Sequence, residues 1–324
     1  MNTTFWGPDG WQFLHTLTFI YPENPDSNEK LKMKNFMNSI CFILPCKYCR
    51  LSFNKYMQSL PIDDYLDSRD LCIEWLYKIH NKVNKKLRIQ GFCKHSNPDL
   101  ADIKTRYKKI TDNICEIMNK YRDDSKDDSK DKDKIKIAKN VINYICNLGA
   151  NFLGSIVFNY QGYFSNCHTS IEKTKIVSVY NTFFNSIIPI LCCYLENFCK
   201  DSKICISKYQ NNFTKFSIRN ILSENEPYTK LIKWFYNYDE LCTMKLIYKT
   251  EKEYEDNFKK HIVISCDNPI IKNVKSCRKA AFRKAAFRKA AFRKSRAKSS
   301  FWKSRAKTLK RLKPLSSARL LNDN

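Results

Sequence analysis

The stretch "LPCKYCR", residues 44 to 50, places two cysteines two residues apart directly after a proline. Because Pro45 lacks a backbone N–H and suits the first turn of a helix, we predict that a helix begins at this C-x-x-C. The backbone N–H groups and the dipole at a helix N-terminus stabilise a thiolate. Neither a strand nor a βαβ pattern surrounds the motif, which argues against a thioredoxin-like domain. Redox chemistry on a helical scaffold is the favoured interpretation.

A zinc site and an inert structural disulfide are the other two interpretations of the C-x-x-C. A zinc site usually needs a second pair of ligands, and the nearest candidates, Cys41, Cys72, Cys93 and His95, stand at irregular distances. We therefore predict no bound metal. The chain has fifteen cysteines, an odd and widely scattered set, which argues against a small disulfide scaffold.

Four helices are predicted in the first 90 residues. Asp9 is the predicted N-cap of the first, and Ser27 or Asn28 begins the second. The third begins at the C-x-x-C, and the fourth follows the capping stretch "DSRD". One face of the first helix carries Trp11, Leu14, His15 and Thr18. Short connections between these segments predict a four-helix bundle.

The fold class is predicted to be mainly α, with this N-terminal bundle, a second, mostly helical domain of unknown fold and a basic tail. The predicted boundaries are 1–95 for the bundle, 96–121 for a helical connection, 122–134 for a charged linker, 135–277 for the second domain and 278–324 for the tail. The linker, "RDDSKDDSKDKDK", is too polar to bury a core. An exposed, charged extension of a helix is the alternative for it.

Residues 135–277 contain no phosphate-binding glycine loop, no H-E-x-x-H and no G-x-S-x-G, so their activity is not predicted. Short strands are possible around "KLIYKT" and "HIVISC". The uncharged run from Ile176 to Leu195 is predicted to be a buried helix, because Pro189 and several polar residues make membrane insertion costly. A membrane anchor at 176–195 is the alternative.

The tail from Arg278 to Asn324 holds seventeen Lys or Arg residues and one acid, with "FRKAA" recurring every five residues. Five residues advance a helix by about 500°, so the repeated phenylalanines would not share a face. A flexible arm that binds nucleic acid or another anionic surface is the predicted role, and a merely solubilising tail is the alternative. No secretory signal is recognised at the N-terminus, so we expect a cytoplasmic protein.

Aromatic, imidazole and amide side chains flank the C-x-x-C on both sides in the sequence. Trp11 and His15 lie four residues apart upstream. A second group lies downstream in the fourth helix: His80, Asn81, Val83 and Asn84. Such groups converging on one bundle interior suit a large, flat cofactor with adenine and phosphates.

These three motifs, W-x-x-x-H, a C-x-x-C preceded by Pro, and H-N-x-V-N-x-K-L, resemble in order and separation the Erv/ALR family of FAD-linked sulfhydryl oxidases. The resemblance covers roughly residues 1 to 95. The long extension and the Lys-, Asn- and Ile-rich composition are most similar to family members from giant DNA viruses. In that setting the protein would work in the host cytoplasm, in a viral factory or in the virion.

The resemblance implies an FAD-dependent thiol oxidase that makes disulfides in substrate proteins. Cys46, the more exposed cysteine, would exchange with a protein dithiol, and Cys49 would pass electrons through the flavin to molecular oxygen, giving hydrogen peroxide. FAD would be bound by Trp11, His15, Tyr21, His80, Asn81, Val83, Asn84 and Lys86, the last by charge on the pyrophosphate. The resemblance also implies a homodimer. Trp75, by contrast, is predicted to be ordinary core.

The chain departs from the family pattern in two places. Tyr77 stands where many relatives have a cysteine, which leaves Cys93 without its expected partner, and Cys41 or Cys72 could substitute. No second C-x-x-C is present to act as a shuttle, and the candidates for that role are Cys266 and Cys277. The competing hypothesis from another class is a viral structural or nucleic-acid-binding protein that acts through its basic tail.

Overall fold

The computed structural model of the chain describes residues 3–92, 95–119, 131–160, 170–199, 206–210, 218–223, 227–237, 244 and 248–261. Residues Met1–Val263 form one compact unit. All regular elements within its described residues are helices, which confirms the mainly α fold class.

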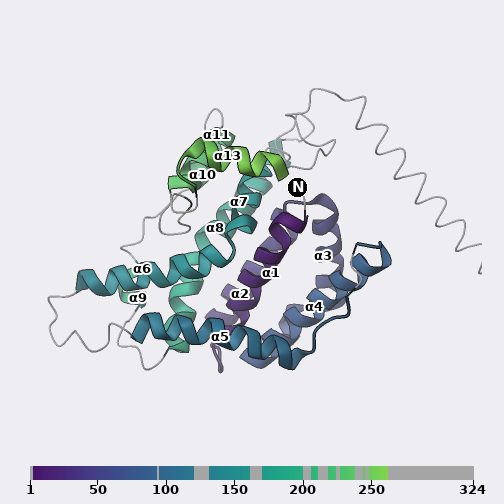
Figure 1. Cartoon of the computed structure of the whole chain (residues 1–324), viewed down its shortest axis with the longest axis vertical. Coiled ribbons are helices and arrows are strands. Elements are labelled where there is room, and N and C mark those ends of the chain that lie inside the picture. Colours follow the sequence, from purple (N-terminus) through teal and green to yellow (C-terminus); the bar gives the residue numbers. More distant parts are fainter. Residues whose placement is uncertain are drawn as a thin grey trace, which may run out of the picture. The chain divides into compact units, whose positions relative to one another are not determined.

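Five long helices and one short 3₁₀ turn make up the first part of the chain (Figure 1). They are α1 (Thr3–Phe19), α2 (Ser27–Ile43), α3 (Lys47–Ser59), η1 (Ile62–Tyr65), α4 (Arg69–Ile89) and α5 (Leu100–Asn119). The starts of α2, α3 and α4 lie at or next to their predicted positions, and α5 lies within the predicted helical connection. Helix α4 packs against α1 and α3, and α3 packs against α2, an arrangement compatible with the predicted bundle.

The predicted N-cap at Asp9 is wrong, because α1 begins at Thr3 and Asp9 lies inside it, after Pro8. The Asp9 carboxylate instead accepts a hydrogen bond of 3.1 Å from the backbone N–H of Asn151. Asn151 is in the first turn of α7 (Ala150–Phe158), whose N-cap, Gly149, has no side chain to offer. Asp9 therefore caps a helix far away in the sequence, and this contact joins the two parts of the chain.

The remaining described helices pack onto the first set. They are α6 (Asp131–Leu148), α7, α8 (Ser170–Phe198), α9 (Ile206–Tyr209), α10 (Ile218–Ser223), α11 (Pro227–Asn237) and α13 (Glu251–His261). Helix α7 runs beside α1, and α8 beside α2 (Figure 1). The chain before and after residue 131 therefore shares one hydrophobic core.

Two glycines allow α1 and α7 to approach closely. A Cβ on Gly10 would lie 3.0 Å from the ring of Phe152, and one on Gly149 would lie 2.8 Å from the Cβ of Phe13. Both distances are shorter than ordinary carbon contacts, so larger residues at these positions would push the helices apart.

The predicted details of the second region agree with the structure in part. Helix α6 begins at Asp131, so the last four residues of the predicted linker are helical, whereas the start of the linker lies outside the described residues. Tyr248–Thr250 is not a strand and His261 ends α13, so the described parts of the two possible strands are not strands. The basic tail lies outside the described residues, and the predicted domain boundaries stay predictions.

Helix α8 contains the uncharged run and is long and apolar enough to cross a membrane. Helices α6 and α7 would form a second such span only if they were taken together across a bend of 72°. Within the described residues, however, α8 packs along α2 and contributes fully buried side chains such as Phe183 and Tyr194. The packing supports the predicted buried helix.

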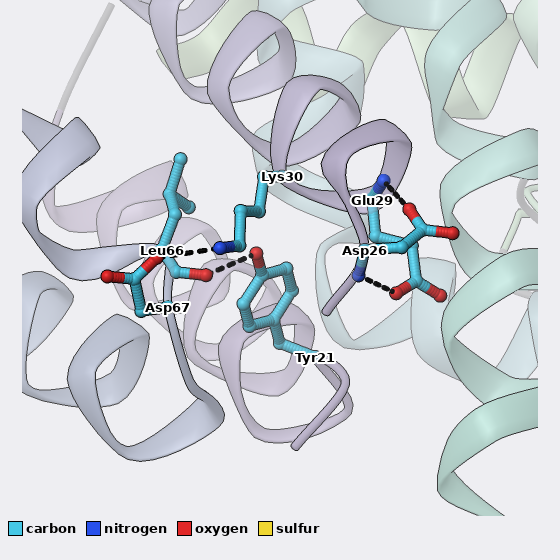
Figure 2. Close-up of polar contacts among 6 residues, drawn as sticks. All are labelled: Tyr21, Asp26, Glu29, Lys30, Leu66 and Asp67. Carbon is cyan, nitrogen blue, oxygen red and sulfur yellow. Dashed lines mark hydrogen bonds and ion pairs between the residues drawn. The ribbon is translucent and has the colours of Figure 1, made fainter. Parts of the chain in front are cut away.

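The contact between α2 and α8 is organised around Glu29. Asp26 and Glu29 form a capping box at the start of α2, with hydrogen bonds of 2.7 and 2.8 Å between each side chain and the other residue's backbone N–H (Figure 2). The same Glu29 carboxylate accepts hydrogen bonds from Asn197 and, at 3.5 Å, from the Cys193 thiol of α8. The Tyr194 hydroxyl donates to the Glu29 carbonyl at 3.0 Å. One buried carboxylate thus both starts a helix and docks another onto it.

Replacing Glu29 by alanine is therefore expected to destabilise the protein strongly. The Glu29→Ala change removes one half of the capping box and the carboxylate that accepts from Asn197, whose amide then keeps only its 3.3 Å bond to the Cys193 carbonyl, so we expect a loss of about 2 kcal/mol in the free energy of unfolding. Urea denaturation followed by circular dichroism measures it. Glu23→Ala, at an exposed position before the same helix, should change stability by less than about 0.5 kcal/mol. Equal effects of the two changes would contradict the docking role.

Candidate active site

The C-x-x-C lies at the start of α3, as predicted. Cys46 is the N-cap residue, with an extended backbone conformation, and its carbonyl accepts the first hydrogen bonds of the helix from Cys49 and Arg50 at 2.9 and 3.0 Å. Both cysteines are half-buried thiols that pack against the main core. Their side chains therefore lie close together at the positive end of a helix.

The pKa values of the two thiols are shifted in opposite directions. The hydrogen bond from the Cys49 thiol lowers the pKa of Cys46 to about 6, against the opposing effect of burial, and backbone N–H groups of Cys49 and Tyr48 lower it further. The pKa of Cys49 is raised, first by its hydrogen bond to Cys46 and then by burial, whereas the Lys86 ammonium acts in the opposite direction. At neutral pH, the Cys46 sulfur is a thiolate and the Cys49 sulfur holds the proton.

Lys86 of α4 lies beside the dithiol. Its ammonium donates a hydrogen bond of 2.6 Å to the hydroxyl of Ser52, one turn after Cys49 on α3. The sequence motif included Lys86 but gave no signal for Ser52, because a serine on a helix surface carries no pattern. The cation is therefore fixed beside the C-x-x-C by a partner on the same helix as the cysteines.

Trp11, His15 and His80 converge between α1 and α4. The Trp11 and His80 rings stack at 3.8 Å with an angle of 10° between their planes. His15 Nε2 and His80 Nδ1 are 3.2 Å apart, so one ring donates a hydrogen bond to the other. This cluster confirms the predicted proximity of the first and third motifs.

Both histidines are held neutral. Burial, with smaller contributions from His80 and Arg106, lowers the pKa of His15 to about 3. Burial also lowers the pKa of His80 to about 4. Among the described residues, no group forms a hydrogen bond with the buried His15 Nδ1. A buried ring nitrogen left in this state is destabilising unless another polar group meets it, so the site suits a ligand with hydrogen-bonding ring atoms.

Two residues of α5, absent from the sequence motifs, complete the surroundings of His15. The Tyr107 ring lies 4.9 Å from the His15 ring and stacks on Phe19 at 5.2 Å. Arg106 is the cation that acts on His15. Helical spacing could have shown that Tyr107 is buried, but not that its neighbour is His15, because α5 joins α1 only in the folded chain.

The polar groups of α4 continue from His80 toward the end of the helix. Asn81, Val83 and Asn84 are half-buried. Asn81 borders an open groove of about 460 Å³ that is otherwise lined by Leu60, Lys78, Lys82, Lys85, Arg88 and Asn97. Four cations along one groove are well suited to phosphate oxygens.

Tyr21 is the predicted cofactor residue that the structure does not bring to this cluster. Its ring is fully buried and meets the ring of Tyr194 of α8 at 5.3 Å. Its hydroxyl donates to the Leu66 carbonyl at 2.9 Å, beside the ion pair of Lys30 and Asp67 (Figure 2). Tyr21 thus holds the end of α1 to the segment that precedes α4. Trp75 is fully buried, as predicted, and donates to the Leu60 carbonyl at 3.1 Å.

Tyr77 stands at the position where many relatives have a cysteine, and it joins α4 to the segment before α5 by a hydrogen bond instead of a disulfide. The Tyr77 hydroxyl donates to the Pro98 carbonyl at 3.0 Å, and its ring packs on the small cluster of Phe19, Ile73, Ile103 and Tyr107. Cys41 and Cys72 are buried and form no disulfide with another described cysteine. Cys93, Cys266 and Cys277 lie outside the described residues, so the shuttle stays a prediction. Within the described ranges, no group of three or more His, Cys, Asp or Glu is placed to hold a metal ion.

Comparison with known proteins identifies the segment that carries this site. Residues 8–108 match the model of the Erv1 / Alr family. Over 85 residues the chain is 38% identical to a protein of Acanthamoeba polyphaga mimivirus named "Probable FAD-linked sulfhydryl oxidase", covering 26% of this chain and 59% of that protein. It is 39% identical over 87 residues to the mitochondrial FAD-linked sulfhydryl oxidase of Saccharomyces cerevisiae, covering 26% of this chain and 44% of that protein. An FAD-linked sulfhydryl oxidase of African swine fever virus is 29% identical over 82 residues, covering 25% of this chain and 67% of that protein.

Residues 8–108, called the family segment below, are thus similar to the Erv1 / Alr family, and viral proteins are among their relatives. The chain spans about half the length of the first two of these relatives. Helices α6 to α13 lie outside the family match.

The acidity of Cys46 gives a testable pH dependence. Because a thiolate reacts with iodoacetamide and a thiol does not, alkylation of Cys46 should reach half its maximal rate near pH 6. Cys49→Ala removes the hydrogen-bond donor and should move that midpoint upward by at least about one pH unit. Mass spectrometry of the peptide that contains Cys46 measures both. Cys41, whose pKa burial raises to about 11, is the internal control and should stay unreacted across this range. A midpoint for Cys46 that is unchanged by Cys49→Ala would contradict the assignment.

Proposed function

We propose that this protein is an FAD-dependent thiol oxidase that makes disulfides in substrate proteins. The observation that carries the proposal is the Cys46–Cys49 pair at the start of α3, with its thiolate and thiol in hydrogen-bond contact and Lys86 beside them. The names of the relatives of residues 8–108 support the same activity.

Exchange with substrate is proposed to occur at Cys46. In the oxidised pair, a substrate thiolate attacks the Cys46 sulfur, and the Cys49 sulfur leaves, its negative charge stabilised by Lys86. The second substrate thiol then gives its proton to the Cys49 thiolate, attacks the mixed disulfide as a thiolate and releases Cys46 as a thiolate. Since the pKa of Cys46 is lowered to about 6, Cys46 is a good leaving group at this step. The proton shared by the two sulfurs of the reduced pair can then move from Cys49 to Cys46, which leaves the charge near Lys86.

The residues between α1 and α4 fit FAD as the cofactor. Trp11 and His80 offer flat surfaces, and His15 Nδ1 offers an unused hydrogen-bonding atom. The separate groove next to Asn81, which is lined by lysine and arginine but by no residue of α1, would offer cations to a diphosphate. Bound flavin would supply an acceptor for two electrons that molecular oxygen can reoxidise to give hydrogen peroxide. The neutral state of both histidines keeps positive charge out of the aromatic part of the site.

Further partners and the location of the protein are proposed from the sequence. Protein dithiols and oxygen follow from the activity, and a homodimer follows from the family resemblance. The basic tail would bind nucleic acid or another anionic surface, with an affinity that falls steeply as salt rises. We propose a cytoplasmic location: the host cytoplasm, a viral factory or the virion.

The first test is the visible spectrum of the purified full-length protein. We expect a flavin band that bleaches when a dithiol is added without oxygen and returns in air. Cys46→Ser and Cys49→Ser should each lower dithiol-dependent oxygen uptake by at least about 100-fold, because each removes one sulfur of the exchanging pair. The Cys49→Ser protein should retain a flavin band that the dithiol does not bleach.

Two matched substitutions distinguish loss of cofactor binding from loss of folding. His15→Ala should lower the flavin content, whereas Tyr21→Phe, which removes only the hydroxyl bonded to Leu66, should keep it. Cys41→Ala, at a buried cysteine away from the pair, should leave the turnover unchanged. A folded, colourless protein that takes up no added FAD would refute the proposed activity.

A further inference from the structure

A second pair of cysteines meets in the described chain, away from the C-x-x-C. Cys115 is on α5, and Cys199 directly follows α8, where its N–H donates to the Leu195 carbonyl at 3.0 Å and so continues the helical turn. The two side chains are in hydrogen-bond contact, although 84 residues separate them in the sequence. Neither belongs to a motif of the sequence.

The surroundings of the pair suit a disulfide within one chain. Cys199 is 5% exposed, and Cys115 is half-buried against the same core. The hydrogen bond to Cys115 and then burial raise the pKa of Cys199, so Cys199 is a protonated thiol at neutral pH. An S–S bond of about 2.05 Å would bring these two sulfurs closer than their present hydrogen-bond contact. Cys72, by contrast, has a pKa raised by burial alone.

We propose that Cys115 and Cys199 form a disulfide that ties α5 to the end of α8. One of the two sulfurs, as a thiolate, attacks a protein disulfide and forms a mixed disulfide with it. The other sulfur then displaces the bound partner, so two electrons reduce the oxidant to two thiols and the two protons end on those thiols. The oxidised Cys46–Cys49 pair of a second copy of this chain is a fitting oxidant, a source that rests on the proposed function.

This disulfide would link two helices, α5 and α8, that each pack against the N-terminal helices. Helix α5 holds Tyr107 and Arg106 against His15, and α8 is docked on α2 through Glu29. A bond between them closes one covalent loop that contains α6, α7 and α8, and long loops gain the most from closure. The disulfide would therefore hold the family segment and the following helices together, and keep α5 over the buried histidine.

The test uses the full chain and a variant that lacks its own redox pair, Cys46→Ser with Cys49→Ser. Both proteins are treated with diamide, a chemical oxidant of dithiols, then alkylated, digested without reductant and analysed by mass spectrometry. We expect a peptide linked through Cys115 and Cys199 in both proteins. The midpoint of thermal unfolding should fall by several degrees when the oxidised protein is reduced, and this fall should disappear in Cys115→Ser. The matched control, Cys192→Ser at another buried cysteine of α8, should keep the fall on reduction.

The outcomes separate this inference from the proposed oxidase. Alkylated thiols at both positions after diamide, or links from either one to a different cysteine, would overturn the disulfide and leave the oxidase untouched. A linked peptide in a protein without flavin would uphold the disulfide and remove the oxidase as its source. Should Cys115→Ser fail to fold, the peptide map of the unsubstituted chain still decides the question.

Discussion

The burial of α1 on several sides is the constraint on which the rest of the structure depends. Helices α4, α5, α6 and α7 all pack against it. On one side, Gly10 and Phe13 pack so closely against Phe152 and Gly149 that a side chain on either glycine would clash. On another, Trp11 and His15 meet His80 of α4. Because the interior is close-packed, a shift of α1 to accommodate a change on the α7 side would also move the histidine cluster.

This arrangement makes the second part of the chain a support for the site. Helix α7 is capped by Asp9 of α1, and α8 is fixed to α2 by the Glu29 carboxylate. Neither contact involves a cofactor residue, yet each holds a helix of the family segment in place. The second region therefore has a structural role: it holds α1 and α2 of the family segment in place.

Burial decides which groups of the site carry charge at neutral pH. Burial keeps His15 and His80 neutral, whereas Lys86 lies beside the dithiol and four further cations line the groove next to Asn81. Both burial and charge act on the dithiol. Hydrogen bonds at the start of α3 stabilise the negative charge on Cys46. Burial and the charge on Cys46 keep the proton on Cys49. A polarised dithiol beside a cation is prepared for thiol exchange before any substrate arrives.

The sequence by itself determined the local elements and the chemistry. Pro45 marked the start of α3, "DSRD" marked the start of α4, and the spacing of Trp11, His15 and His80 predicted a shared cofactor site. Only the tertiary structure decided which distant residues meet. Asp9 caps α7 rather than its own helix, Tyr107 covers His15, Tyr21 packs on Tyr194, and Cys115 meets Cys199. The physical reason is that capping signals and helical periodicity act over a few residues, whereas these contacts depend on how whole helices pack, which no short pattern encodes.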